Sequence, residues 1–216
     1  MTGTATMKTT MLRALVAALC LSGASAAQAQ WAEYRPDSSL WLTGWGLAQP
    51  LGNYTDFQTG TSTAGFSMEF RSMVKPRLSA GLAFDYNRFD HSNSLESKGY
   101  PNGGVVSAPT YRYSDQFGIK LTGHYYFAES GFRPYLGAGV GGNWNYSYIQ
   151  VADLASYDQG FTAIFTPEAG ILWELVGGRT QVALNLALRY NLTTAWFHGV
   201  ENAQWLSEVV GIAISY

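Results

Sequence analysis

Apolar residues alternate with small or polar residues along most of the chain, and the alternation is clearest towards the C-terminus. Within 181–194 the apolar residues share one side: Val182, Leu184, Leu186, Leu188, Tyr190 and Leu192. The final segment repeats the pattern, with Val210, Ile212 and Ile214 on one side and Gly211, Ala213 and Ser215 on the other. A period of two residues is that of a β-strand, whose side chains point alternately to its two faces. The chain is therefore predicted to be all-β.

The pattern divides the chain into eight strands that are joined alternately by short turns and long connections. We predict strands over 39–49, 62–73, 78–90, 111–127, 132–149, 161–175, 181–194 and 204–216. The short turns contain Gly or Pro and lie at 74–77, 128–131 and 176–180. The longer, polar connections lie at 50–61, 91–110, 150–160 and 195–203. This arrangement predicts an eight-stranded antiparallel up-and-down transmembrane β-barrel.

Alternation alone does not say which face of each strand points outward. A soluble barrel of the lipocalin type would place the leucine face inside. Charged residues are only 13% of this chain, whereas an ordinary soluble domain has about 25%. The opposite face is rich in glycine and carries charges of both signs, which suits the narrow lumen of an eight-stranded barrel. We therefore expect the apolar stripes to contact lipid.

The expected lumen face carries a polar cluster of Glu69, Arg71, Asp85, Arg112, Lys120, His124, Glu168 and Arg189. Ionised groups in a narrow lumen must pair or meet water, because an isolated buried charge costs about several kcal/mol. The cluster could be a polar conduit or gate, or a paired plug that rigidifies the barrel. Eight strands enclose little more than side-chain volume, which favours the plug.

Aromatic residues gather near both ends of the predicted strands, as a girdle at each membrane interface requires. At the end with the short turns, predicted to be periplasmic, we expect Tyr125, Phe127, Trp173 and Tyr216. At the outer end we expect Tyr86, Tyr111, Tyr113 and Tyr190. Aromatic residues also favour strands for other reasons, so the girdle assignment depends on their position.

The N-terminal 29 residues have the features of a secretory signal peptide: Lys8 and Arg13, an apolar stretch, and small residues ending in Ala29. We predict cleavage before Gln30, a short periplasmic segment over 30–38 and a barrel over 39–216. Cys20 is the single cysteine, so the mature chain would have no disulfide. Loss of Lys8 and Arg13 would leave eleven basic against fifteen acidic residues, which gives no electrostatic basis for binding nucleic acid.

Motifs that could indicate chemistry have simpler explanations in this chain. The pattern G-x-G-x-x-G occurs at 137–142, but a strand-like sequence follows it where a nucleotide-binding fold needs a helix. A hydrolytic set of His198, Glu201 and Ser207 is the least unfavourable catalytic combination, without the His-x-Ser spacing of barrel deacylases. We expect no catalytic residue, no cofactor and no metal site.

The chain resembles the small outer-membrane β-barrel superfamily, the group with OmpA-like, OmpX-like and OmpW-like domains. The resemblance rests on 46–56, on 132–141, on 167–170 and on the terminal Tyr216. It implies a bacterial outer-membrane location after Sec-type export, and contact with membrane lipid and lipopolysaccharide. It also implies recognition by the barrel-assembly machinery through the last strand, which ends at Tyr216.

The function expected from these features is non-enzymatic: a structural or surface-interaction role, with a filled lumen and a contact surface at the predicted loop 91–110. One alternative is OmpW-like passage of small hydrophobic molecules through the lumen mouth and barrel wall. Lipid A or phospholipid hydrolysis is a more distant alternative, and it would need a His close to a Ser that faces the outer leaflet.

Overall fold

The computed structural model describes residues 39–99, 105–152, 154–176, 181–194, 196–197 and 200–215. The predicted signal peptide, the segment 30–38 and Tyr216 lie outside these residues, so their assignments stay predictions. Within the described ranges, no helix has the length and apolar character needed to cross a membrane.

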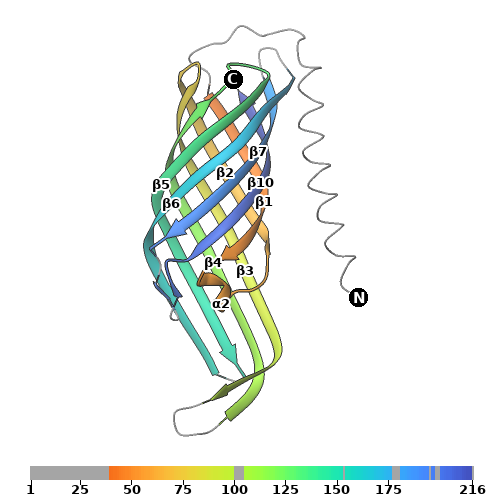
Figure 1. Cartoon of the computed structure of the whole chain (residues 1–216), viewed down its shortest axis with the longest axis vertical. Helices are drawn as coiled ribbons and strands as arrows, with labels where there is room; N and C mark the ends of the chain where they lie inside the picture. The colour runs from red at the N-terminus through yellow and green to blue at the C-terminus, as the bar shows by residue number, and fades with distance from the viewer. Residues whose placement is uncertain are drawn as a thin grey trace.

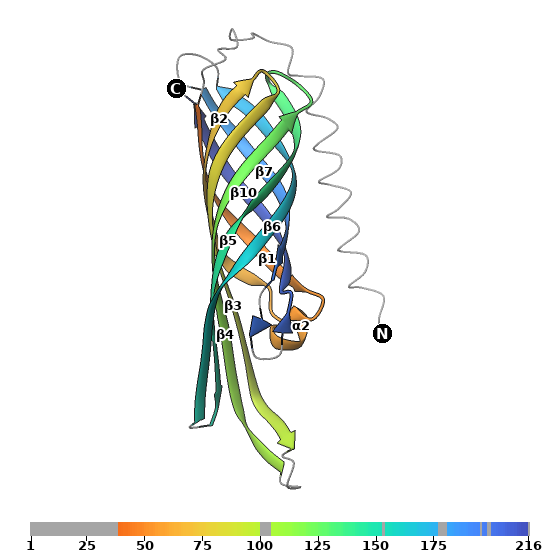
Figure 2. The ribbon, with the colours of Figure 1, turned by 90° about the vertical axis from the view of Figure 1, so that its left-hand side faces the viewer.

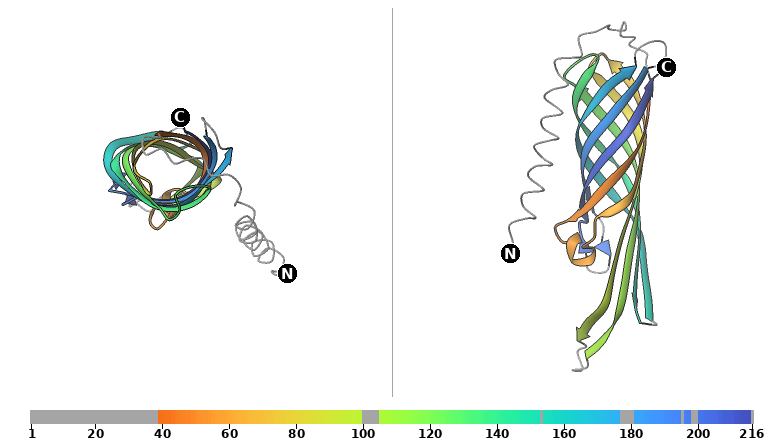
Figure 3. Two further views of the ribbon diagram at one scale, coloured as in Figure 1. Left: turned by 90° about the horizontal axis from the view of Figure 1, so that it is seen from above. Right: turned by 90° about the vertical axis from the view of Figure 1, so that its right-hand side faces the viewer.

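The described strands close into a single barrel, which confirms the predicted fold (Figure 1). Eight described strands form it in the order β1-β10-β7-β6-β5-β4-β3-β2. Their bounds are β1 Ser39–Leu51, β2 Ser62–Lys75, β3 Leu78–Gly99, β4 Val105–Tyr126, β5 Phe132–Val151, β6 Leu154–Val176, β7 Gln181–Thr193 and β10 Gln204–Ser215. Neighbouring strands are antiparallel, and β1 pairs with β10 from Leu40↔Ser215 to Leu51↔Gln204. The view along the axis shows the closed ring (Figure 3).

The apolar stripes point outward and the small or charged stripes point to the lumen, as predicted. Large apolar side chains are exposed on the outer wall, among them Trp41, Trp45, Phe84, Leu121, Val140, Phe165, Leu188, Val210, Ile212 and Ile214. Their chain neighbours on the inner wall are buried, among them Leu42, Ala83, Ala187, Val209 and Ala213. The exterior of the barrel is therefore an apolar wall suited to contact with hydrocarbon.

The predicted long connections at 91–110 and 150–160 are wrong, because strands continue through most of both. β3 extends to Gly99 and β4 begins at Val105, while β5 and β6 meet at a tight turn after Val151. These hairpins project beyond the barrel as one continuous sheet, with β4 paired to β5 as far as Thr110↔Val151 (Figure 2). Their Gly, Pro and Ser content suggested loops, whereas cross-strand pairing of Tyr and Ser residues sustains the strands. We call β3–β6 beyond the barrel rim the protruding sheet.

The other long connections contain small elements at the same end of the barrel. The connection 50–61 contains the single helical turn α2, Tyr54–Phe57. The connection 195–203 contains the short strands β8, Trp196–Phe197, and β9, Val200–Glu201, which pair with each other. We call this end the mouth end, and the end with the short turns the turn end. α2 lies at the mouth end (Figure 1 and Figure 2).

Side chains fill the lumen in layers from one end to the other. An apolar cluster lies at the turn end: Leu40, Leu42, Met73, Tyr126, Tyr135, Leu172, Ala183 and Ala213. A second apolar cluster lies at the mouth end: Ala48, Tyr54, Phe57, Phe89, Ile164, Val200, Ala203 and Trp205. Between them lies an ionic layer and then a layer of neutral side chains formed by Ser114, Gln116, Asn143 and Asn145. The polar layers are thus sealed between two apolar ones.

Candidate functional site

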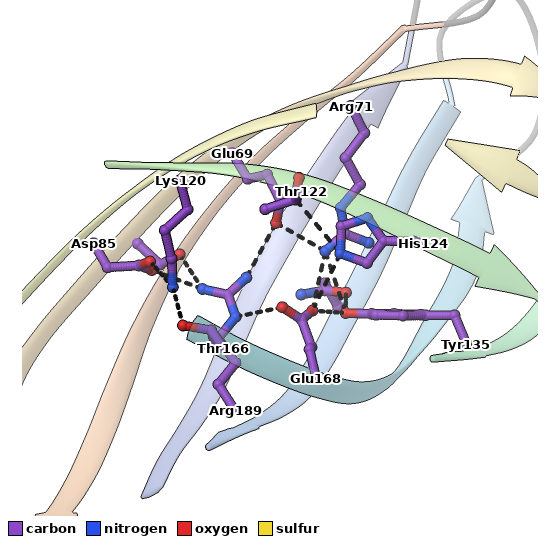
Figure 4. A network of polar contacts seen from close by, with 12 residues as sticks. Glu69, Arg71, Asp85, Lys120, Thr122, His124, Tyr135, Thr166, Glu168 and Arg189 are labelled. Carbon is purple, nitrogen blue, oxygen red and sulfur yellow. Dashed lines mark hydrogen bonds and ion pairs between the residues drawn. The ribbon is translucent and has the colours of Figure 1, made fainter. Parts of the chain in front are cut away.

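Arg189 is the centre of the ionic layer and contacts carboxylates from three other strands (Figure 4). Its Nε donates to Glu168 Oε2 at 2.7 Å, and its Nη1 donates to Asp85 Oδ1 at 2.7 Å. Its Nη2 donates to Glu69 Oε2 at 3.1 Å, and Nη1 also donates to Ser67 Oγ at 2.6 Å. Arg189 therefore ties β7 to β2, β3 and β6 across the lumen.

Arg71 makes a second set of contacts on the turn side of Arg189. Its Nη2 is 2.8 Å from Glu69 Oε2 and 3.1 Å from Glu168 Oε1, so both arginines share the same two carboxylates. Arg71 Nη1 also donates to the Tyr126 hydroxyl at 3.2 Å, and its guanidinium lies 4.7 Å from the centre of the Tyr135 ring. Tyr135 in turn donates to Glu168 Oε1 at 2.6 Å. The tyrosines connect the ionic layer to the apolar cluster at the turn end.

Lys120 completes the layer on the mouth side. Its Nζ lies 2.6 Å from Asp85 Oδ2 and donates to Thr166 Oγ1 at 3.2 Å. The Thr166 hydroxyl in turn donates a hydrogen bond to Asn191 Oδ1 at 3.0 Å. The hydrogen bonds of the ionic layer therefore continue through Thr166 to Asn191, whose Nδ2 donates to Ser207 Oγ.

The ionic layer is balanced in charge within the described lumen. Three carboxylates face three cations: Glu69, Asp85 and Glu168 with Arg71, Lys120 and Arg189. Removing single charges from water is costly, and good geometry with further hydrogen bonds is needed to offset that cost. Here each ion pair is supplemented by hydroxyl groups, as in the Thr122 hydrogen bond to Glu69 Oε1 at 2.7 Å. Such an arrangement is suited to holding strands together across the lumen.

Glycines on the inner wall make room for these large side chains. A Cβ at Gly137 would overlap the His124 ring, and a Cβ at Gly170 would overlap the ring and hydroxyl of Tyr135. A Cβ at Gly118, by contrast, would meet no atom closer than 3.8 Å. The G-x-G-x-x-G pattern at 137–142 lies inside β5 and precedes no helix. Gly137 and Gly139 face the lumen, whereas a Cβ at Gly142 would overlap the exposed ring of Phe161.

Seven of the eight residues predicted for the polar cluster lie together, and Arg112 does not. Arg112 of β4 lies opposite His91 of β3 and Ile149 of β5, on the mouth side of the neutral layer. Arg112 is an even number of residues from Lys120 and so lies on the same face of β4. However, β4 continues past the barrel rim, and Arg112 therefore lies on the protruding sheet. The predicted cluster also omitted Tyr126, Tyr135 and Thr122, although their positions on the same inward stripes could have indicated them.

The described lumen brings together groups that could in principle act in chemistry, but the two carboxylates are already paired with arginines. One ligand atom each of Glu69, His124 and Glu168 lies within 4.8 Å of the others, a spacing that a metal could bridge. Arg71 and Arg189 already neutralise both carboxylates. Ser79 Oγ lies 3.4 Å from His124 Nδ1, and both residues are buried.

Of the hydrolytic set predicted as a candidate from sequence, Ser207 does not face lipid. Ser207 points into the lumen, where its Oγ accepts a hydrogen bond from Asn191 Nδ2 at 3.1 Å. Glu201 is exposed on β9 at the mouth end, and His198 lies outside the described residues. The requirement for a Ser that faces the outer leaflet is therefore not met by Ser207.

The described aromatic residues predicted for the girdles lie on the outer wall at both ends, and Tyr216 lies outside the described residues. Tyr125, Phe127 and Trp173 are exposed at the turn end, where Tyr125 and Phe127 meet edge to face at 5.5 Å. At the mouth end, Tyr190 donates to Gln204 Oε1 at 2.6 Å and Tyr86 donates to Asp115 Oδ1 at 2.8 Å. Tyr111 and Tyr113 stand further out on β4, with ring centres 5.8 Å apart.

The outer face of the protruding sheet is dominated by tyrosine. Tyr113 stacks on Tyr148 with ring centres 5.0 Å apart, and Arg88 lies 4.6 Å from the centre of the Tyr113 ring. On β6, Tyr157 lies opposite Tyr148 of β5, and Phe161 lies opposite Trp144 of β5. The side chains of Tyr157 and Phe161 are 70% and 71% exposed. This face is aromatic and accessible, which are features of recognition surfaces.

The edge of the protruding sheet along β6 has no partner strand among the described residues. β6 pairs with β7 only from Ile164↔Thr193 onward, whereas it pairs with β5 from Leu154. Ala163 exchanges hydrogen bonds with Thr194 on the β7 side, while the Asp158 carbonyl accepts from Ser147 of β5. Because backbone groups alternate along a strand, the N–H and C=O groups of Ala155, Tyr157, Gln159 and Phe161 point away from β5 along this open edge.

Comparison with solved structures finds the same architecture in small outer-membrane proteins. Neisserial surface protein A superposes with a TM-score of 0.50 at 15% identity, over 84% of this chain and 98% of its own. Ail, the attachment invasion locus protein of Yersinia pestis, superposes with a TM-score of 0.52 at 9% identity, over 84% and 100%. Ail in complex with the heparin analogue sucrose octasulfate gives 0.51 at 8% identity, over 84% and 100%. No protein-family model and no curated protein sequence matches the chain.

At such low identity the likeness is one of fold. The closed antiparallel barrel, its apolar exterior and its filled lumen define the class: a small eight-stranded barrel of the outer-membrane type. The predicted resemblance to this superfamily is confirmed at the level of architecture.

Proposed function

We propose that this protein is a bacterial outer-membrane surface protein that acts by binding rather than by catalysis, and that its protruding sheet is the binding element. In the outer membrane, the turn end would face the periplasm and the mouth end would face outward, as is usual for barrels with short periplasmic turns. Export through the predicted signal peptide and assembly through the final strand are parts of the same proposal.

The open edge of β6 is the observation that carries the proposal. An unpaired strand can accept an extended segment of another polypeptide, with main-chain hydrogen bonds supplying affinity. Natural proteins usually protect such edges with Pro or Lys, or keep them short. The segment 155–161 contains neither residue and presents Tyr157 and Phe161 beside its free backbone groups. We therefore infer an extended polypeptide as the ligand class.

Charge argues against a polyanionic ligand for this surface. Ail has been crystallised with a heparin analogue. In this chain the segments 86–115 and 145–161 contain three basic residues, Arg88, Lys98 and Arg112, against five acidic ones: Asp90, Glu96, Asp115, Asp153 and Asp158. A net negative surface repels sulfated glycans, so strand addition is the better supported mode of binding.

The filled lumen argues against the alternative of molecular passage. Two apolar clusters close the described lumen on either side of the ionic layer, so a solute would have to displace many packed side chains. The protruding sheet requires no such rearrangement to meet a partner.

The proposal is tested by removing one backbone donor from the open edge. Gln159→Pro deletes an N–H that points away from β5, whereas Gln159→Ala keeps it and serves as the matched control. Cells displaying each variant are compared for adhesion to surfaces coated with an unfolded protein such as casein or with heparin. We expect wild type and Gln159→Ala to adhere to casein, and Gln159→Pro to adhere at least about fivefold less.

Surface abundance is measured for each variant with an antibody against an added epitope. Equal adhesion of Gln159→Pro and wild type at equal abundance contradicts strand addition. Adhesion to heparin in preference to casein would instead identify a glycan-binding surface.

A further inference from the structure

The open edge of β6 presents two different faces to a strand that pairs with it. Side chains alternate along 155–161, so odd-numbered residues lie on the outer face of the protruding sheet and even-numbered residues on its inner face. The outer positions include Tyr157 and Phe161, and both side chains are well exposed. Aromatic side chains of this kind pair favourably with aromatic or β-branched side chains directly across the strands. A bound strand is therefore expected to turn residues of these types outward.

The inner face of the same edge carries one acidic residue between two small ones. The even-numbered positions are Ser156, Asp158 and Gly160, and Asp158 is partly exposed. A Cβ at Gly160 would meet no described atom within 4 Å, so the space beside Asp158 is open. The backbone carbonyl of Asp158 accepts from Ser147 Oγ at 3.3 Å, whereas its carboxylate has no ion-pair partner among the described residues. The inner face thus offers an accessible negative charge with room around it.

The backbone of the edge would place a bound strand close to this carboxylate. The odd-numbered residues turn their N–H and C=O groups to the open side, so they would form the hydrogen-bonded pairs with an antiparallel strand. Asp158 would then lie in a non-hydrogen-bonded pair, where Cα atoms are about 4.5 Å apart and side chains are closest. Gly160 leaves the diagonal position empty, so a long side chain of the bound strand can cross it to reach Asp158.

The charges of the protruding sheet favour a cation at this point. The basic residue Arg112 shares the inner face, but it lies on β4, opposite Ile149 of β5, which in turn lies opposite Ser156 of β6. Neighbouring strands are about 4.8 Å apart, so the Arg112 backbone is about 10 Å from the edge strand. A basic residue of a bound strand would pair directly with Asp158, whereas an acidic residue there would be repelled.

We propose that the β6 edge selects extended segments in which basic residues alternate with aromatic or β-branched residues. The basic residues face Asp158 on the inner side, and the aromatic or β-branched residues face Tyr157 and Phe161 on the outer side. This inference rests on the proposed function, strand addition at β6, and adds the sequence class of the ligand. An acidic segment would keep the main-chain hydrogen bonds and lose the favourable side-chain pairs.

The test uses the full-length chain folded in dodecylphosphocholine micelles and a set of fluorescently labelled seven-residue peptides. The lysine peptide has lysine at its even positions and tyrosine or valine at its odd positions. The serine and glutamate peptides differ from it only by replacement of the lysines. Fluorescence anisotropy measures each affinity. We expect the lysine peptide to bind at least about threefold more tightly than the serine peptide, and the glutamate peptide to bind most weakly.

Substitutions of acidic residues separate a specific pair from general attraction. Asp158→Asn should abolish the preference for the lysine peptide over the serine peptide, because the facing carboxylate is gone. Asp90→Asn is the matched control: it removes the same charge from an exposed position on β3, three strands away from β6, and should keep the preference. Asp158→Lys should reverse the order and favour the glutamate peptide.

A second pair of variants tests the outer face. Tyr157→Thr should weaken binding of the lysine and serine peptides alike by at least about threefold, because both carry the tyrosine and valine that face outward. Tyr111→Thr makes the same change at an exposed position of β4, away from the edge, and should leave both affinities unchanged. Circular dichroism verifies that each variant is folded.

Two results would overturn the proposed selectivity while leaving strand addition intact. One is equal affinity of the wild-type protein for the lysine and serine peptides. The other is the same loss of preference in Asp158→Asn and Asp90→Asn. Strand addition itself is tested by a lysine peptide that is methylated at the amides of its odd-numbered residues and cannot donate them to β6. If this peptide binds as tightly as the unmethylated one, the proposed function fails and the selectivity fails with it.

Discussion

At the scale of single residues, the lumen is held by shared ion pairs. Glu69 and Glu168 each contact both Arg71 and Arg189, so neither arginine depends on a single acid. Truncating one partner of a buried pair leaves the other charge unpaired and away from water. An exposed pair loses much less, because water replaces the lost partner. The same substitution should therefore have very different effects at the two kinds of site.

Replacing Arg189 with Met should lower the free energy of unfolding by about 3–5 kcal/mol, because three carboxylates lose a buried partner. The control is Arg77→Met on the turn after β2, where Arg77 and Glu129 are 3.0 Å apart and both 49% exposed. That change should cost less than about 1 kcal/mol. Urea unfolding in lipid vesicles, followed by tryptophan fluorescence, measures both. Similar losses for the two variants would mean that the lumen pairs are not energetically central.

At the scale of elements, each strand has one face for the outside and one for the lumen. β10 shows this most simply, with Ile212 exposed and its neighbours Gly211 and Ala213 turned inward. The outer face must be apolar over the height of the hydrocarbon layer and can become polar near the interfaces. The energetic effect of a charge on this face should therefore depend on its depth along the strand.

Ile212→Arg places a charge on the outer wall of β10, where Ile212 is 51% exposed, and should destabilise the folded barrel by about 2–4 kcal/mol. Val74→Arg is the control, since Val74 is 58% exposed beside the turn after β2 and should cost at most about 1 kcal/mol. The measurement is equilibrium unfolding from bilayer vesicles. Equal effects at both positions would show that this wall does not contact hydrocarbon as assigned.

At the scale of the whole molecule, the described lumen is sealed rather than open. The ionic layer ties β2, β3, β6 and β7 together, and the apolar clusters cover it at the turn end and at the mouth end. Each layer uses side chains from strands far apart in sequence, so the layers exist only where the closed barrel brings these strands together. The protruding sheet extends from this rigid base.

The wild-type protein should show no steady open current in planar bilayers. Phe57→Ala, which weakens only the cluster at the mouth end, should also stay closed because the ionic layer and the turn-end cluster persist. Single-channel recording tests both, with a large porin in the same membrane to verify detection. A stable conductance level in the wild-type protein would contradict a packed lumen and would favour the conduit alternative.

The sequence alone determined the strand class, the number of barrel strands and the face that each strand turns outward. These properties are local, because side chains alternate between the two faces of a strand. Once one side chain is assigned to the outer or the inner face, all the others in that strand are assigned as well. The inward stripes likewise contained the charged residues of the ionic layer, from Glu69 on β2 to Arg189 on β7.

Only the tertiary structure decided where strands end and which residues meet across the lumen. The predicted loop 91–110 is mostly strand because β3 and β4 go on pairing beyond the barrel rim. The same extension separates Arg112 from the ionic layer, and barrel closure places α2 over Trp205 at the mouth end. Register between strands is a long-range property, and composition within a short segment carries little information about it.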